Sequence, residues 1–447
     1  MANPGDRGVR EAAAALRSRE LSSKELVEGC LARIRERDGS HSYDGDPASI
    51  NAWVRVYEED ALEAAARADD RLGQGDAPEL CGIPIGLKDL YAVAGKPLTA
   101  SSRALNDVPE RDCDVWERLR AEGMVLLGHV HTHEFAAGGT TDQVGNPWAL
   151  ELSAGGSSAG SSAALAARMV PAATGTDTAG SVRIPSAMAG TSALKPTRGR
   201  LPMRGIVPLS PSLDHPGPMA RTLGDCELLF AAMLGAAAPP ERRPLVRVAI
   251  SPRIGDLDPD VADGFDAALA VLAALDAERA EPPPPAAPLD LGYEFADLVC
   301  TDMLPYHRHT DLDLCRPFLR DFIEYGEQRA MSGEEYVALQ SRRAEHSASW
   351  CDWFAEHRID AIVEPTVPIV ARKRGNGYEK AFTDYKEISL THYWDWTGLP
   401  AVALPSGVGG RSGLPTSVSL IGGPGSEWDL LAWGAALQDE LGTVSPQ

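Results

Sequence analysis

Serine and threonine hydroxyls are concentrated between residues 153 and 185, where glycines separate them. A serine hydroxyl can attack a carbonyl carbon once a nearby base removes its proton, and glycines allow close backbone approach and positive φ. The apolar segment AALAARMVPAA (163–173) interrupts the run and predicts a buried helix followed by a short strand. A flexible Gly/Ser linker would not need such a segment. The sequence therefore predicts two loops that meet at one candidate catalytic site.

Two patterns in this region match nucleophile motifs only weakly. Residues 156–160 match G-x-S-x-G, the strand-to-helix turn of α/β-hydrolases, which would make Ser158 the nucleophile. However, GNPWALELSA before it is a poor strand, and His392 is the only late histidine that could act as the base. Residues 192–195 match the S-x-x-K of penicillin-recognising enzymes, but no S-D-N or K-T-G motif follows, and KPTRGR is typical of a turn.

A third pattern joins both loops to Lys88, and its residues resemble the amidase signature enzymes. The resemblance rests on GGSSAGSSAA (155–164), on GTDTAGSVRIP (175–185) and on Lys88 within GIPIGLKDL. Other segments follow in the family's order: ELVEGCLARI, NPW, LKPTRGR, SLDHPGPMART, WTGLPAVALP and LPTSVSLIGGPGSEWDLL. Carried over residue by residue, the resemblance implies Ser181 as nucleophile, Ser157 as a bridging serine at a cis peptide bond, and Lys88 as base. It implies no metal and no organic cofactor.

The chemistry of these side chains agrees with the implied roles. A lysine is a base near neutral pH only if it is uncharged, and burial at the end of an apolar strand would lower the pKa of Lys88. Ser157 would then relay the proton between Lys88 and Ser181 and later return it to the leaving amine, so that no histidine is required. The oxyanion is expected to be bound by the backbone N–H groups of Thr178, Ala179, Gly180 and Ser181.

The turn departs from the family pattern at two positions. Ala159 and Ala179 stand where many members carry glycine, and a methyl group is tolerable there if φ is negative. The string TDTAGS resembles that of allophanate hydrolases. Asp177 and Arg183 flank the turn, and we expect them to form a buried pair that braces it.

The resemblance implies an amidohydrolase that cleaves a carboxamide C–N bond through an acyl-enzyme on Ser181. Three alternatives stay open: the catalytic subunit of a tRNA-dependent amidotransferase, an allophanate-type hydrolase and a non-catalytic relative. The amidotransferase subunits usually read S-I-R-Q-P after the nucleophile, whereas residues 181–185 read S-V-R-I-P. The presence of the lysine and both serines disfavours the non-catalytic alternative.

Aromatic side chains are frequent in the part of the chain that lines the acyl pocket in the family, between residues 300 and 395. We hypothesise that Trp394, Trp396 and Tyr385 contact substrate and that the pocket admits an aromatic or otherwise apolar acyl group. The neighbouring aromatic residues are Trp350, Trp353, Phe354 and Tyr393.

His131 and His133 form an H-x-H pattern, which places both side chains on one side of a strand. No third metal ligand is evident nearby, so we expect them to form part of the wall around the site rather than a metal centre.

Composition excludes several classes of protein. With 447 residues and 44% apolar content, the chain can bury a substantial core and is not disordered. A net charge of −22 would repel a polyanion, so we expect no nucleic-acid partner. The resemblance implies a small-molecule amide substrate. The seven cysteines contain no C-x-x-C pair, and no signal peptide or membrane span is evident. We therefore expect reduced thiols, a cytoplasmic location and no membrane attachment; a homodimer is an open alternative.

Hydrophobic periodicity alternates between strand-like and helix-like segments, which predicts an α/β fold. Ser22 and Glu25 predict a capping box at the second of two helices within 8–38. The Pro- and Gly-rich segment 193–220 is expected to be a loop. Helices are expected at 58–73, 113–122, 225–235, 260–277, most of 289–358 and 427–441, and strands at 50–57, 81–88, 124–130, 246–251, 360–363 and 416–422. With the resemblance, this predicts one α/β/α domain (1–447) around a mixed twisted sheet, with an N-terminal helical layer (1–75) and a variable substrate-pocket region (281–395).

Overall fold

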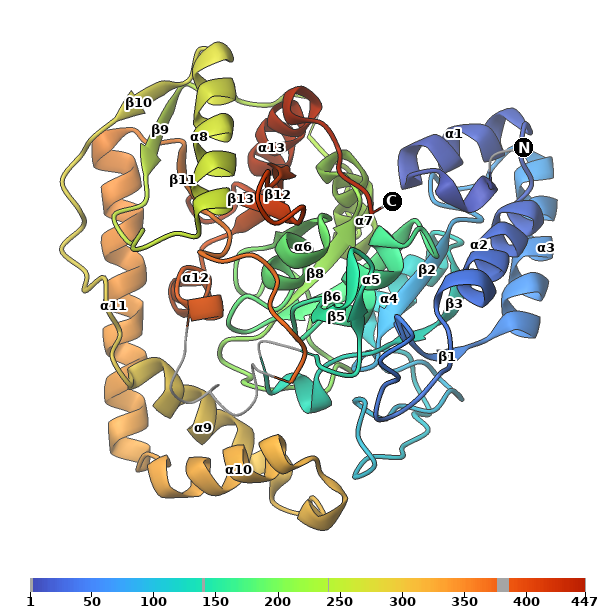
Figure 1. Ribbon diagram of the computed structural model, residues 1–447, viewed down its shortest axis with the longest axis horizontal. Coiled ribbons are helices and arrows are strands. Elements are labelled where there is room, and N and C mark those ends of the chain that lie inside the picture. Colours follow the sequence, from blue (N-terminus) through green and yellow to red (C-terminus); the bar gives the residue numbers. More distant parts are fainter. Residues whose placement is uncertain (1–2, 139–140, 240, 376–385, 447) are drawn as a thin grey trace.

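The computed structural model describes residues 3–138, 141–239, 241–375 and 386–446. A mixed eleven-stranded sheet runs through them in the order β1-β3-β2-β6-β8-β7-β12-β13-β11-β9-β10 (Figure 1). Its strands are β1 (Trp53–Val56), β2 (Pro84–Lys88), β3 (Val125–Val130), β6 (Ala172–Asp177), β7 (Ser192–Lys195), β8 (His215–Ala220), β9 (Arg247–Ile250), β10 (Glu278–Ala280), β11 (Ala361–Pro365), β12 (Ala401–Val408) and β13 (Pro415–Ile421). The predicted mixed sheet is confirmed, because β2 pairs in parallel with β3 and β6, whereas β8 pairs antiparallel with β6 and β7.

Helices cover both faces of this sheet. The helices in the described part of the chain are α1 (Val9–Ser18), α2 (Ser23–Arg37), α3 (Glu58–Gln74), α4 (Asp114–Ala121), α5 (Ala159–Ala166), α6 (Arg183–Ala189), α7 (Leu223–Leu234), α8 (Pro259–Ala274), α9 (Glu294–His307), α10 (Pro317–Arg329), α11 (Gly333–His357), α12 (His392–Thr397) and α13 (Glu427–Leu441). Successive strand residues point to opposite faces. Ala172 and Leu194 accordingly belong to the core that contains α7, whereas Ala173 and Ala193 belong to the core that contains α5. The predicted α/β/α arrangement follows from this alternation.

The N-terminal helices pack at one end of the sheet. Ser22 and Glu25 form the predicted capping box at the start of α2, because each side chain bonds to the backbone N–H of the other. The helix α2 packs against α3, and α1 packs against α7. The single sheet is the arrangement expected of one domain, and the division into a layer at 1–75 and a pocket region at 281–395 stays a prediction.

The expectation of a loop at 193–220 was wrong at both ends, which form β7 and β8. Proline normally disfavours a central strand because it cannot donate a backbone hydrogen bond. Pro216 and Pro218 are alternate residues of β8, so the N–H groups they lack would both have pointed to the same edge. The other neighbour, β7, pairs with β8 only at Met219 and Ala220, beyond the prolines. The strand therefore loses little from either proline.

The segment GNPWALELSA also differs from expectation. It forms β4 (Gly145–Asn146) and β5 (Ala149–Ser153), a separate two-stranded antiparallel pair outside the main sheet. The main-sheet strand of a G-x-S-x-G elbow is thus missing before Ser158 in the described part of the chain.

The helices α9, α10 and α11 form an outer helical layer (residues 294–357) along the left and lower edges of Figure 1. The proline-rich segment 281–288 connects β10 to this layer, and the Pro283 carbonyl accepts a hydrogen bond from the Trp353 indole on α11. The layer also packs against α12 through α11. It also meets the central sheet directly, because Arg247 on β9 donates a hydrogen bond of 2.9 Å to the carbonyl of His357 at the end of α11.

Candidate active site

Lys88 occupies the carboxyl end of β2, between β3 and β6, and is fully buried. Its Nζ lies 2.7 Å from Ser157 Oγ, 2.8 Å from Ser158 Oγ and 2.9 Å from Thr176 Oγ1. Thr176 lies on the adjacent strand β6, and the two serines lie in the loop that leads into α5. The side-chain nitrogen is thus surrounded by three hydroxyl groups.

Burial lowers the pKa of Lys88 from 10.5 to about 7, against the opposing charges of Asp177 and Asp214. Desolvation has this effect because it disfavours the ammonium form. A neutral amine has two N–H groups and one lone pair, so one of the three hydroxyls can donate its proton to Nζ. The amine is therefore substantially available as a base near neutral pH.

Backbone contacts fix the loop that carries Ser157. The Gly156–Ser157 peptide bond is cis, as the resemblance implied. The Ser157 carbonyl accepts hydrogen bonds from the His133 backbone N–H at 2.9 Å and from Thr141 Oγ1 at 3.2 Å. Gly160 allows the start of α5 to lie close to the backbone of His131, because a Cβ on Gly160 would lie 2.4 Å from the His131 backbone nitrogen.

Ser181 lies in the turn between β6 and α6 and is 5% exposed. Its backbone carbonyl accepts a hydrogen bond of 3.3 Å from the N–H of Ser158, so this turn lies directly beside the loop that carries Ser157. The fold thus brings together Lys88, Ser157 and Ser181 from three separate stretches of the sequence.

The turn before Ser181 requires glycine at residue 180 but not at residue 179. Gly180 has a φ of 125°, and a Cβ on it would lie 2.3 Å from Thr391 Oγ1. Neither Ala179 nor Ala159 is among the described residues with positive φ, so each methyl group is accommodated as predicted. Thr391, the residue immediately before α12, donates a hydrogen bond of 2.6 Å to the Ala179 carbonyl and braces the turn.

One of the four expected oxyanion donors is already engaged. The N–H of Gly180 donates to Asp177 Oδ1 at 2.6 Å. Within the described part of the chain, the N–H groups of Thr178, Ala179 and Ser181 have no hydrogen-bond acceptor. These three groups are the ones free to bind an oxyanion in this arrangement.

The predicted Asp177–Arg183 pair is confirmed, and Asp395 of α12 joins it. Arg183 Nε and Nη2 each donate to Asp177 at 3.0 Å, and Nη2 also donates to Asp395 Oδ2 at 2.6 Å. All three side chains are buried. Burial alone would raise the pKa of Asp177, but the charge and hydrogen bonds of Arg183 lower it well below its usual range. Both Gly180 and Val182 donate their N–H groups to Asp177, so the ion pair holds the turn in place.

Two of the three aromatic residues expected to contact substrate lie in the packed interior. Trp394 and Trp396 are fully buried, and their indole N–H groups donate to Glu364 at 2.5 Å and to His346 at 3.0 Å. Tyr385 lies outside the described residues. A role for these three residues in substrate binding stays a prediction.

His131 and His133 are buried beside the site, and burial lowers the pKa of each to about 3. His131 Nδ1 lies 3.1 Å from Ser101 Oγ, and the backbone of His133 holds Ser157. In the described ranges, no group of three or more His, Cys, Asp or Glu side chains is arranged to hold a metal ion. The seven cysteines, all within those ranges, are free thiols as expected.

Sequence reasoning missed Asp395 and Thr391 as neighbours of the site. Thr176 is one of the hydroxyls grouped between residues 153 and 185, but its contact with Lys88 was not predicted. Asp395 and Thr391 follow the turn by more than two hundred residues and belong to no local motif that points to it. Only the packing of α12 against the turn shows their contribution.

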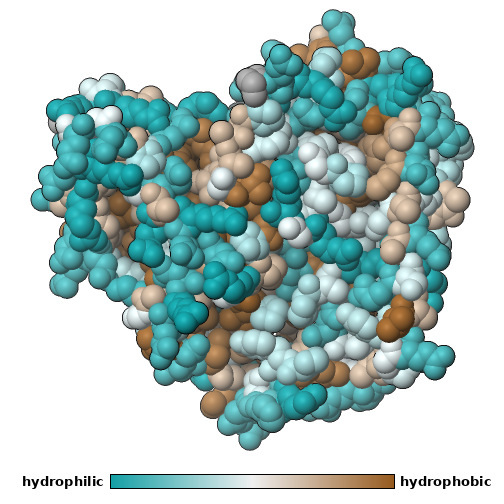
Figure 2. Space-filling model, turned by 180° about the vertical axis from the view of Figure 1, so that it is seen from behind, coloured by the Kyte–Doolittle hydropathy of each residue, from teal (hydrophilic) through white to brown (hydrophobic). Residues whose placement is uncertain are grey.

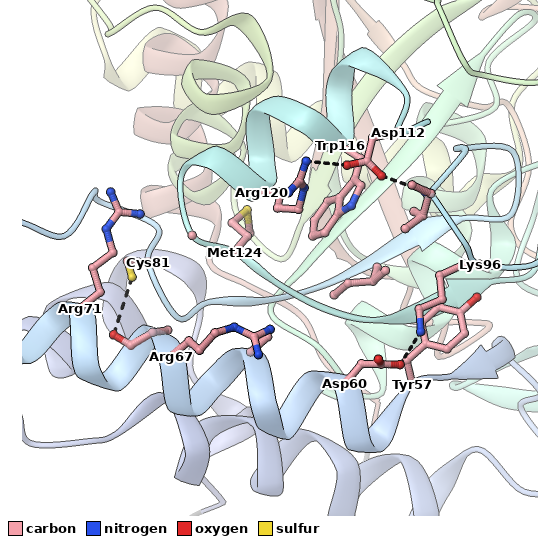
Figure 3. A pocket seen from close by; sticks show the side chains of 16 residues that line it. Tyr57, Asp60, Arg67, Arg71, Cys81, Lys96, Asp112, Trp116, Arg120 and Met124 are labelled. Carbon is pink, nitrogen blue, oxygen red and sulfur yellow. Dashed lines mark hydrogen bonds and ion pairs between the residues drawn. The ribbon is translucent and has the colours of Figure 1, made fainter. Parts of the chain in front are cut away.

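A separate cavity of about 460 Å³ lies between α3 and α4 (Figure 3). Charged side chains at its rim already pair with each other: Lys96 with Asp60, and Arg120 with Asp112. None of the residues around Lys88 and Ser181 lines it. It is therefore distinct from the candidate active site.

The face shown in Figure 2 is mostly hydrophilic, and apolar residues gather on it only in small areas. Across the described ranges, no helix is both long and apolar enough to cross a bilayer.

Comparisons with known proteins identify the family of the chain. The family model described as Amidase matches residues 41–431. The glutamyl-tRNA(Gln) amidotransferase subunits A of Methylococcus capsulatus and Thioalkalivibrio sulfidiphilus are 35% and 34% identical to the chain, with 95% and 93% of this chain and 94% and 93% of each relative covered. A solved 6-aminohexanoate cyclic dimer hydrolase superposes with a TM-score of 0.85 at 26% identity, covering 99% of both chains. The chain therefore belongs to the amidase family, whose signature motifs its sequence resembles.

Proposed function

We propose that the protein is a serine amidohydrolase with Ser181 as nucleophile, Ser157 as proton relay and Lys88 as base. The observation that carries this proposal is the 2.7 Å contact between Lys88 Nζ and Ser157 Oγ in a fully buried site beside the Ser181 turn. A base with a pKa of about 7 is matched to proton transfer at neutral pH.

The proposed reaction has two stages. In the first, Ser181 Oγ attacks the amide carbonyl carbon while its proton passes to Ser157, whose own proton passes to Lys88. The tetrahedral intermediate collapses when the C–N bond breaks, and the leaving amine receives the proton back through Ser157. In the second, water attacks the acyl-enzyme by the same proton route and releases the carboxylic acid and free Ser181.

The oxyanion would be bound by backbone N–H groups of the turn. Thr178, Ala179 and Ser181 supply the three candidates, because the N–H of Gly180 donates to Asp177. Donors fixed by the fold are effective because they need no reorganisation as charge develops on the oxygen.

The substrate class is a small-molecule amide, and an apolar acyl group is our hypothesis. Ile184, which is 1% exposed, packs against the Gly180 turn, so the side of the turn toward α6 is apolar. The solved relative named 6-aminohexanoate cyclic dimer hydrolase supports hydrolysis of an amide on this fold. Seven free cysteines are typical of a reducing compartment, which supports a cytoplasmic location.

A second candidate is the catalytic subunit of a tRNA-dependent amidotransferase, because the relatives of 34–35% identity carry that name. Such a subunit would need a partner and a route for ammonia. Ile184 stands where those subunits usually carry glutamine, and the net charge of −22 disfavours direct contact with RNA. A glutaminase activity that appears only with a partner subunit would favour this candidate.

The test is covalent labelling by a fluorophosphonate together with a screen of aliphatic, aromatic and amino-acid amides. We expect Ser181→Ala to abolish both labelling and turnover. Ser192→Ala is the matched control, because Ser192 is equally buried and belongs to the rejected S-x-x-K pattern. Retention of labelling in Ser181→Ala would refute the assignment.

A further inference from the structure

A tight turn at residues 210–214 is hydrogen-bonded to the candidate oxyanion turn. Asp214, which is 6% exposed, accepts a hydrogen bond of 2.6 Å from Thr178 Oγ1. The same carboxylate accepts the backbone N–H groups of Leu209 at 2.9 Å and Ser210 at 3.1 Å. Because this one carboxylate accepts hydrogen bonds from Thr178 and from the backbone at Leu209 and Ser210, it fixes the position of one segment relative to the other. The 210–214 turn therefore sets the place of Thr178, three residues before Ser181.

The outer helical layer holds the 210–214 turn from the opposite side. Asp302 on α9 accepts the Ser210 hydroxyl at 2.5 Å, the Ser212 hydroxyl, and the Ser212 N–H at 3.2 Å. Tyr336 on α11 donates its hydroxyl to the other oxygen of Asp302 at 2.9 Å. Asp302 is half-buried and accepts hydrogen bonds from all four of these donors. A continuous path of hydrogen bonds thus runs from α11 through Asp302 to the turn.

A second path starts from Arg343, also on α11, which is 1% exposed. Its guanidinium donates to the carbonyls of Ser212 at 2.7 Å, Asp395 at 3.0 Å and Trp396 at 2.6 Å. The carboxylate of Asp395 in turn accepts from Arg183, which holds the Ser181 turn through its ion pair. Arg343 therefore joins the 210–214 turn to α12, and each of these segments bonds to the turn that carries the nucleophile.

We propose that Asp302 and Arg343 are positioning residues for the reaction at Ser181, through which the outer helical layer holds the oxyanion donors in place. The inference rests on the proposed function. Neither side chain touches the reacting atoms; each fixes a segment that is bonded to residues 177–183. A displacement of roughly 1 Å in such a support can reduce the rate about 100-fold. Because oxyanion donors act on the transition state, the loss falls on kcat rather than on KM.

The experiment compares Asp302→Ala, Ser210→Ala and Arg343→Lys with controls from the same helices. Asp297→Ala on α9 removes an ion pair with Arg329 that stays within the outer layer. Arg342→Lys on α11 alters an exposed pair with Glu294. The readouts are kcat and KM on the best amide of the screen, the fluorophosphonate labelling rate, and the melting temperature.

We expect the three test variants to lose roughly 10- to 100-fold in kcat and in labelling rate with little change in KM, and the controls to stay near the wild type. Asp302→Asn keeps one acceptor oxygen for the two serine hydroxyls and should recover part of the loss.

Wild-type labelling rates in both Ser210→Ala and Asp302→Ala would overturn the inference, as would equal losses in the controls. These outcomes are distinct from failure of the proposed function, which would appear as labelling that survives in Ser181→Ala. Ser210→Ala removes a single oxygen atom, so it keeps the inference testable if Arg343→Lys does not fold.

Discussion

Lys88 Nζ lies 2.7 Å from Ser157 Oγ, and neither side chain is exposed to solvent. The same burial that removes water from this contact also disfavours the charged form of the lysine. Burial of this contact thus keeps Ser157 beside the lysine and favours the uncharged form that a lysine base needs. Lys88 Nζ also contacts the hydroxyls of Ser158 and Thr176, so its action as a base depends on which of the three hydroxyls donates a proton to it.

The pH dependence of activity should report the ionisation of Lys88. The amine is the active form, and its pKa is lowered to about 7, so kcat/KM should rise with pH through about 7 and then level off. The measurement is kcat/KM for an uncharged amide at a series of pH values, together with the fluorophosphonate labelling rate. An activity that falls as the pH rises through 7, or that rises only near pH 10, would contradict a neutral lysine base.

The stability of the fold should depend on pH through the same residue. The unfolded lysine has a pKa near 10.5 and the folded one about 7, so between these values the unfolded state binds more protons. The free energy of unfolding contributed by Lys88 therefore increases as the pH rises from 7 to 10.5, and the destabilisation is complete below 7. Urea unfolding of the wild type and Lys88→Met at several pH values measures this. We expect the wild type to gain stability relative to the variant over that interval; a constant difference would show that the lysine is charged in the folded state.

Ser157 and Ser158 should differ sharply in their effect on turnover, although both contact Lys88 at nearly the same distance. Only Ser157 is assigned a place in the proton route, so Ser157→Ala should reduce kcat by roughly 10³-fold or more, within the range of general acid–base catalysis. Ser158 also directs its hydroxyl to the Thr176 carbonyl at 3.4 Å, which is a supporting contact. Ser158→Ala should cost about 10-fold or less. Equal losses in the two variants would exclude the assigned relay.

The grouping of Lys88, Ser157 and Ser181 at one candidate site could be predicted from the sequence, because each lies in a short motif whose residue types and order are specific. Their roles in the reaction stay a prediction. The sheet and most helices could be predicted as well, since their apolar residues recur with the periods of strands and helices. The contacts that hold the site could not be predicted. Asp395 and Arg183 are separated by more than two hundred residues in the sequence, and no local sequence pattern indicates that they form an ion pair.

The strand β8 shows a second reason why prediction failed. Its sequence, HPGPMA, has the composition of a loop, and only the pairing of its neighbours makes two prolines tolerable in a sheet. The sequence does not distinguish a core role from a substrate contact for Trp394 and Trp396, because aromatic side chains near a substrate pocket and aromatic side chains in a core have the same sequence pattern. Both side chains are buried, and their contact with substrate stays a prediction.

Exchange of glycine and alanine should reduce activity strongly at residue 180 but little at residue 179. Gly180 has a φ of 125°, and a Cβ there would meet Thr391 Oγ1 at 2.3 Å, so Gly180→Ala should displace the turn and reduce kcat by roughly 100-fold. Ala179 does not need positive φ, so Ala179→Gly should keep most activity and lower stability by about 0.4–1 kcal/mol through the entropy of the unfolded chain. The fluorophosphonate labelling rate and urea unfolding of both variants check this. A fully active Gly180→Ala enzyme would show that the turn relaxes without loss of the oxyanion donors, and the geometry proposed for them would then be wrong.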